Sequence, residues 1–158
     1  MFRKMRRIKQ QIGDSECIAV LKAETRGVLS LVGDNGYPYA VPMNHWYCEE
    51  DGKLYFHGAR EGQKIDLIKE NNKVCYTVYD KGYSKDGEWS LNVKSVIILG
   101  EITPVTDGEK AKKICTALCR KFTDDEEYLK KELESALLRV LCLELTPVHM
   151  TGKLVNEA

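Results

Sequence analysis

The stretch KLYFHGAREGQKIDLIKENNKVCYTVYD, residues 53–80, changes its hydrophobic periodicity twice. It begins as a strand that stops at His57-Gly58-Ala59, and residues 63–71 then place apolar side chains at helical spacing. Residues 74–79 return to a strand composition, rich in valine, tyrosine and threonine. We therefore predict a strand, a short helix and a second strand in direct succession.

The junction between the first strand and the helix has the features of an anion site. Gly58 and Gly62 permit a close approach of the backbone to another group. The free N–H groups of the first helical turn and the helix dipole attract anions. Lys64 and Arg60 add full positive charges. The pattern suggests phosphate binding, although an ordinary turn beside a solvated Lys64 has the same appearance.

Strand patterns also dominate on both sides of this stretch. The sequence GDNG, residues 33–36, is typical of a hairpin turn, because asparagine and glycine tolerate positive φ. The last strand is expected to be followed by a short tail. Strands are predicted over residues 28–32, 37–48, 54–57, 74–79, 93–103 and 139–146, and helices over residues 14–23, 63–71, from 107 onward and over 124–138.

The order of these elements determines the expected fold class. Strands predominate, with one helix in the middle and two before the final strand, which is unlike the regular alternation of a doubly wound sheet. We predict a single domain over residues 1–158 that is mainly β with appended helices. A small closed or partly open barrel fits best, because closure removes exposed sheet edges.

The charge and composition exclude several classes of protein. Lys and Arg total 24, as do Asp and Glu, so no net field gathers nucleic acid or anionic lipid. No run approaches the roughly 18 apolar residues of a membrane span. The basic start MFRKMRRIKQQIG lacks the apolar stretch of a signal peptide. We expect a cytoplasmic protein that binds neither nucleic acid nor membrane.

The cysteines and histidines do not form a metal motif. None of the six cysteines forms a CxxC pair, and we expect reduced, mostly buried thiols. Cys115 and Cys119 share one face of a predicted helix but lack two further ligands nearby. His45, His57 and His149 are too scattered to supply them. We predict no metal site.

A second unusual stretch is GYPYAVPMNHWY, residues 36–47. Pro38 and Pro42 remove two backbone donors from a predicted strand. The strand is therefore expected at a sheet edge, or at a site where residues 41–44 face something other than a neighbouring strand. An irregular edge strand is the simpler interpretation.

Together, these stretches resemble the flavin-binding split-barrel proteins related to pyridoxamine 5′-phosphate oxidase, and most closely the branch of nitroimidazole-resistance (Nim) proteins. The resemblance rests on GYPYAVPMNHWY and on DGKLYFHGAREGQKIDLIKENNKVCYTV. VKSVIILGEITPV, residues 93–105, is similar to the family's strand of the form SV-x-x-x-G. The start FRKMRRIKQQI is similar to the family's basic opening helix.

The resemblance implies a six-stranded antiparallel Greek-key split β-barrel. It further implies a homodimer that holds FMN near the subunit interface. The residues that grip pyridoxal phosphate in the oxidase itself find no match, so that activity is not expected. The implied flavin contacts are Val41, Pro42, Met43 and Asn44 along the ring, His57, Gly58, Ala59 and Lys64 toward the phosphate, and Ser95 and Val96 from the next strand.

A flavin supplies the electron chemistry, while protein groups bind, orient and tune it. The family suggests an FMN-dependent oxidoreductase that reduces nitroaromatic, 5-nitroimidazole-like or similar small electron acceptors. His57 is the candidate catalytic proton donor, with a hydrogen bond to phosphate or backbone as the alternative. His45 is a candidate for the border of the substrate pocket. A non-catalytic flavin-binding or storage protein, and a split barrel that uses haem or a deazaflavin, are the other functions considered.

Overall fold

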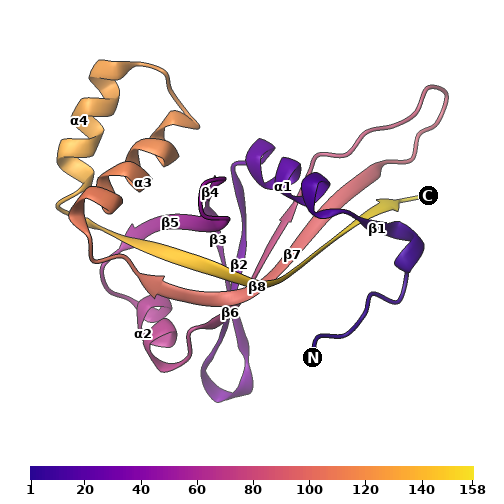
Figure 1. The fold of residues 1–158 in the computed structure, drawn as a ribbon, viewed down its shortest axis with the longest axis horizontal. Coiled ribbons are helices and arrows are strands. Elements are labelled where there is room, and N and C mark those ends of the chain that lie inside the picture. Colours follow the sequence, from indigo (N-terminus) through magenta and orange to yellow (C-terminus); the bar gives the residue numbers. More distant parts are fainter.

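A computed structural model describes residues 1–158 and shows one antiparallel sheet that curls into a half-barrel (Figure 1). The hydrogen-bonded order of the strands is β3-β2-β6-β7-β8-β5-β4, and β1 pairs with β8 beside this path. The strands are β1 (Gln11–Ile12), β2 (Arg26–Val32), β3 (Pro38–Asn44), β4 (Trp46–Cys48), β5 (Lys53–Ala59), β6 (Lys73–Tyr79), β7 (Asn92–Pro104) and β8 (Val140–Asn156).

Four helices are attached to this sheet. Two of them, α1 (Asp14–Ala23) and α2 (Gln63–Glu70), contribute side chains to the main core. The other two, α3 (Gly108–Arg120) and α4 (Glu126–Ala136), form a pair at one end of the sheet, between β7 and β8 in the chain (Figure 1). The side chain of Asp107 accepts hydrogen bonds from the first turn of α3, which confirms the predicted helix start.

The main core lies on one face of the curled sheet. It contains 20 buried residues, and fully buried Leu29, Tyr76 and Ile98 come from the adjacent strands β2, β6 and β7. Alternate residues of a strand point to opposite faces, and on the other face Val32 and Ile97 remain exposed. The sheet is therefore buried on one side and uncovered by helices along β2, β6 and β7 on the other.

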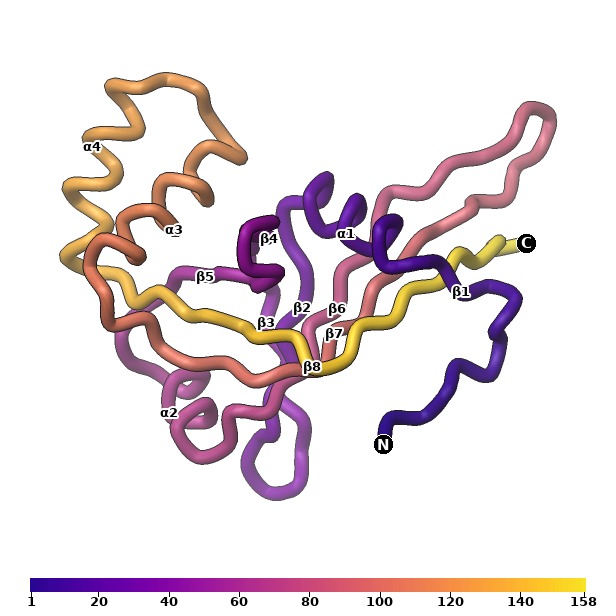
Figure 2. The backbone as a smooth tube through the Cα atoms, in the orientation of Figure 1, coloured from indigo at the N-terminus to yellow at the C-terminus, as the bar shows by residue number.

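The two ends of the sheet are joined by a single residue, His45. β3 ends at Asn44 and β4 begins at Trp46, so the two strands follow one another along the chain (Figure 2). They nevertheless stand at opposite ends of the hydrogen-bonded order. The prediction of one strand over residues 37–48 is therefore wrong. His45 is fully buried and its backbone N–H bonds to the Thr25 carbonyl, which breaks the strand in two. β3 and β5 lie side by side here without ladder hydrogen bonds.

The prolines of β3 have the predicted placement. β3 forms one edge of the sheet, where the missing N–H groups of Pro38 and Pro42 interrupt no ladder on the outer side. The GDNG turn is also confirmed, since Asn35 and Gly36 both have positive φ. None of the helices is long and apolar enough to span a bilayer.

Both chain ends differ from expectation. The last strand is predicted to stop at residue 146, whereas β8 continues to Asn156. Pro147 lies at a bulge where the pairing with β7 shifts register, and the ladder then resumes. The start of the chain forms only a short 3-10 turn (Ile8–Gln10) and β1, not the opening helix that the family resemblance implies. With β1 and β4 the sheet has eight strands rather than six.

Candidate functional site

The predicted anion site forms where β5 ends and α2 begins. Gly62 precedes the helix with φ 129°, a conformation that residues with a Cβ rarely adopt. No side chain caps the first turn of α2. Its N–H groups therefore remain available, and an anion placed there would also interact with the positive end of the helix dipole.

Lys64 is the central side chain of this site. Its Nζ lies 3.4 Å from the sulfur of Met43, and it makes no ion pair. The side chain is half-buried, and this burial lowers the pKa of Lys64 from its ordinary value. A thioether is a weak acceptor for an ammonium group. The site therefore presents a partly desolvated positive charge that lacks a counter-charge.

Gly58 gives Lys64 its room. A Cβ at residue 58 would lie 2.9 Å from Lys64 Nζ, closer than real Cβ contacts come. The amine thus sits over the bare backbone of β5, between that strand and Met43 of β3. The structure thereby brings together Met43, Gly58 and Lys64 from three different elements.

His57 lies beside this group, but its side chain belongs to the other face of β5. Leu54 and Phe56 point into the main core, whereas Tyr55 points beneath α3, and strand alternation gives His57 the direction of Tyr55. Gly58 faces the Lys64 amine on the opposite side. Burial by surrounding atoms, followed by the charge of Lys64, lowers the pKa of the exposed His57 ring. Both effects favour the neutral form of His57.

The predicted ring contacts on β3 divide between two faces. Val41 and Met43 point inward, where Met43 is buried and Val41 packs against the core. Pro42 and Asn44 are exposed on the outer face. Ala59 is also exposed, at the end of β5. Only part of the set therefore borders the Lys64 amine.

Ser95 and Val96 lie elsewhere on the sheet. Val96 is fully buried in the main core, between β6 and β8, so its side chain has no free surface. Ser95 lines a hollow of about 530 Å³ along β7 and β8, together with Phe2 and His149. That hollow contains none of the residues from β3, β5 or α2. Within one chain, Ser95 does not join the group around Lys64.

Two other candidates from the sequence are placed differently from expectation. Arg60 donates to the Leu137 carbonyl at 3.3 Å, toward the end of α4 rather than to the helix start. His45 is fully buried and does not border a pocket. Its Nε2 donates to the Leu21 carbonyl at 2.7 Å, and its Nδ1 lies 2.7 Å from Tyr76 Oη. Burial, with the charge of Lys121, lowers the pKa of His45 to about 4.

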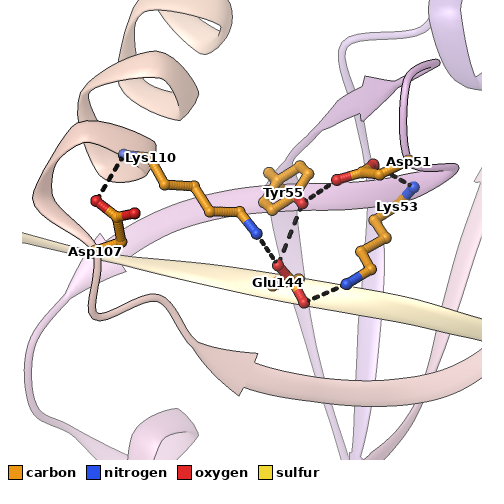
Figure 3. Close-up of polar contacts among 6 residues, drawn as sticks. All are labelled: Asp51, Lys53, Tyr55, Asp107, Lys110 and Glu144. Atoms are coloured by element: carbon orange, nitrogen blue, oxygen red, sulfur yellow. Dashed lines mark hydrogen bonds and ion pairs between the residues drawn. The ribbon is translucent and has the colours of Figure 1, made fainter.

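A polar cluster under α3 is not predicted from the sequence (Figure 3). Glu144 of β8 accepts hydrogen bonds from Lys53, Lys110 and the Tyr55 hydroxyl, and Tyr55 also donates to Asp51. Burial opposes the charged form of Glu144, but the two lysines outweigh it and lower its pKa to about 2. These residues come from distant parts of the chain, so no local pattern announces them. The cluster fastens α3 to β5 and β8.

The uncovered sheet face carries a hollow of about 650 Å³. Its apolar lining includes Leu31, Leu99 and the exposed Val148. Large exposed apolar patches usually mark a surface that binds another molecule.

A family model for pyridoxamine 5′-phosphate oxidase matches residues 13–154 of the chain. The chain belongs to this oxidase family. No curated protein sequence matches it.

Solved structures agree on the split-barrel fold. A Bacteroides thetaiotaomicron protein named for 5-nitroimidazole antibiotic resistance superposes with a TM-score of 0.77 at 24% identity, covering 92% of this chain and 87% of the other. A FAD-binding protein from Mesorhizobium loti gives 0.69 at 21% identity, with 92% and 97% covered. The flavocytochrome of Azotobacter vinelandii gives 0.69 at 22% identity, with 97% and 72% covered. The half-barrel is thus the split barrel of the oxidase family.

Membership in the oxidase family gives the Lys64 group a context. The family model spans β3, β5, α2 and β7, the elements that carry all the predicted flavin residues. The unpaired ammonium group and the uncapped helix start suit a phosphate group, which offers charge and several acceptor oxygens. The described residues therefore fit the phosphate end of a flavin nucleotide.

Proposed function

We propose that this protein is an FMN-dependent oxidoreductase that reduces nitroaromatic or similar small electron acceptors. The observation that carries the proposal is the unpaired, half-buried ammonium group of Lys64 over Gly58. A charge of this kind is costly to bury without a partner. A flavin phosphate would supply that partner.

The residues that would hold the cofactor fall into two groups. Lys64 and the first-turn N–H groups of α2 would bind the phosphate, and Met43 with Val41 would border the ring from β3. Gly58 leaves room for the Lys64 amine beside the backbone of β5. Bound flavin would supply the electron-transfer chemistry, and the chain would supply binding, orientation and shielding from water.

His57 has a smaller part in this proposal than its place in the motif suggests. Burial and the charge of Lys64 lower the pKa of His57, which disfavours the protonated form that a general acid needs. Its side chain also points away from the Lys64 amine. We infer that His57 acts through hydrogen bonds, while its backbone continues the strand toward Gly58 and the helix start.

The proposal includes a homodimer, because one chain leaves the site divided. Ser95 lies on the uncovered face of β7, whereas Lys64 lies at the edge near β3. A second copy on the apolar face would bury Ile97 and Val148. It would also bring a second Ser95 strand toward the first chain's β3 edge, since Pro42, Asn44 and Ser95 share that outer face by register.

The alternative function is a flavin-binding protein without catalysis, which would have the same phosphate contacts. Titration of FMN, FAD and riboflavin into apo-protein measures the role of the phosphate and of the adenosine group. We expect FMN to bind most tightly. If riboflavin binds as well as FMN, the phosphate assignment fails.

A kinetic comparison distinguishes an enzyme from a binding protein. The pre-reduced, FMN-loaded protein is mixed with a 5-nitroimidazole under anaerobic conditions, and flavin reoxidation is followed by stopped-flow absorbance. We expect reoxidation faster than that of free reduced FMN at the same concentration. A rate equal to or below that of free FMN would support storage.

A further inference from the structure

Two buried thiols touch beneath α3. The Sγ atoms of Cys115 in α3 and Cys142 in β8 lie 3.6 Å apart, and the residues are only 1% and 2% exposed. Both are free thiols in this structure. A disulfide requires a sulfur–sulfur distance of about 2.05 Å. The two sulfur atoms are therefore in van der Waals contact, and they would have to move closer together to form a disulfide.

This contact is specific among the six cysteines. It is the one hydrogen-bonded contact between two thiols, while Cys75 approaches a threonine hydroxyl instead. Cys17 lies in the main core near Gly152, on the other side of the sheet from α3. Cys48 shares the small core under α3 but makes no thiol contact.

The two thiols differ in their acid–base character. A hydrogen bond from Cys142 lowers the pKa of Cys115, despite its burial. The same hydrogen bond, followed by burial, raises the pKa of Cys142. Thiolates rather than thiols attack disulfides. Of the two thiols, Cys115 is therefore the one whose thiolate is favoured.

The pair lies where the helices α3 and α4 join the sheet. The chain leaves the sheet after β7, forms α3 and α4, and returns as β8, with Cys115 in the first helix and Cys142 near the start of the returning strand. A bond between them would close the base of this helical pair. Cys142 also pairs in register with His57 on β5, so the bond would form directly opposite the strand end of the candidate site.

We propose that Cys115 and Cys142 are a redox modification site that forms a reversible disulfide with a small disulfide oxidant and locks α3 onto the sheet. When α3 opens locally and exposes the pair, the Cys115 thiolate attacks one sulfur of the oxidant RSSR, which breaks the RS–SR bond and releases one RS⁻. Cys142 then attacks Cys115 Sγ and displaces the second RS⁻. The two protons lost by the cysteines pass to the two thiolates, so the oxidant gains two electrons and the protein loses two.

Thiol counting tests the site directly. The full-length protein is incubated with oxidised glutathione, unfolded in denaturant containing iodoacetamide, and analysed by intact mass and peptide mapping. We expect free thiols to fall from the six of the sequence to four, with one internal Cys115–Cys142 link that dithiothreitol reverses. The C115S and C142S variants should form no internal link, and C119S should form it as wild type does.

A second measurement on wild type avoids dependence on variants that fold poorly. Amide exchange of oxidised and reduced protein is compared, and we expect exchange in α3 to slow by about tenfold or more on oxidation, since local opening is then restricted. Exchange in β2 and β6, which lie across the sheet from the pair, serves as the internal control. A link that involves Cys48 or any other cysteine, six free thiols after oxidation, or unchanged exchange in α3 would overturn the proposal.

Discussion

Lys64→Met separates ligand binding from folding stability, because the ammonium group should favour one and oppose the other. In the chain alone, Lys64 Nζ is half-buried beside a thioether and has no carboxylate partner. Methionine has a similar length and would pack against Met43 without charge. We therefore expect the variant to bind FMN less tightly and, without ligand, to be more stable than wild type.

The two magnitudes follow from the environment of the amine. A hydrogen bond to a charged group contributes about 1.5–3 kcal/mol, which corresponds to a roughly 10- to 150-fold increase in the Kd for FMN. An unsatisfied buried polar group costs about 1–3 kcal/mol, and partial exposure of Lys64 places its cost near the lower bound. Relief of about 1 kcal/mol would raise the Tm of the apo-protein by about 2–4 °C.

The assay combines flavin titration with thermal unfolding of the apo-protein. FMN and riboflavin are compared, because only FMN carries the phosphate, and the Kd for riboflavin should change by less than about threefold. Lys69→Met, in the exposed last turn of α2, is the matched control and should change neither flavin's affinity. Lys64→Glu should weaken FMN further, since it places a like charge beside the phosphate. Equal losses for both flavins, or a less stable Lys64→Met apo-protein, would refute the reasoning.

Three other expectations come from separate parts of the molecule. Glu144 has a folded pKa of about 2 against an ordinary 4.5, so its ionised form stabilises the fold by on the order of 2 kcal/mol above pH 4.5, and this stabilisation is lost as the pH falls through 2. Urea unfolding of wild type and E144Q should therefore show a difference in the free energy of unfolding that narrows only between pH 4.5 and 2. His57→Gln should leave FMN bound and change the stopped-flow rate less than about threefold, whereas a loss near 10²-fold with a missing pH limb would restore His57 as the proton donor. Ile97→Asp, on the uncovered face, should convert a species of roughly twice the 18.0 kDa chain mass into monomer in sedimentation, and a wild-type monomer that binds FMN tightly would count against the shared site.

Local patterns were sufficient for the elements that begin or end with strong chemical signals. The helix that becomes α1 matches residues 14–23 as predicted, and Asp107 marks the start of α3. The glycine-flanked helix start beside Lys64 and the edge position of the proline-bearing strand were also accessible, whereas only the family resemblance placed Met43 with Lys64. These features depend on short-range geometry.

Long-range pairing explains what the sequence did not reveal. Residues 147–156 look like a tail because Pro147 interrupts the pattern, yet the long β7 supplies a partner beyond the bulge. His45 reads as a candidate pocket residue, but Leu21 and Tyr76, both far away in sequence, satisfy its ring nitrogens inside the core. The cluster around Glu144 likewise depends on contacts between β5, β8 and α3.

Beside the single-residue link at His45, β3 and β5 lie next to each other without ladder hydrogen bonds, so the half-barrel is not closed along this line. Met43 of β3 lies on one side of this line, where the Lys64 amine contacts its sulfur, and Gly58 of β5 lies on the other side, and no ladder hydrogen bonds join the two strands. A ligand that contacted both strands would therefore bridge two parts of the sheet that the backbone connects here only through one buried histidine. Because such a ligand would bind the folded barrel and not the unfolded chain, its binding free energy would add to the free energy of unfolding.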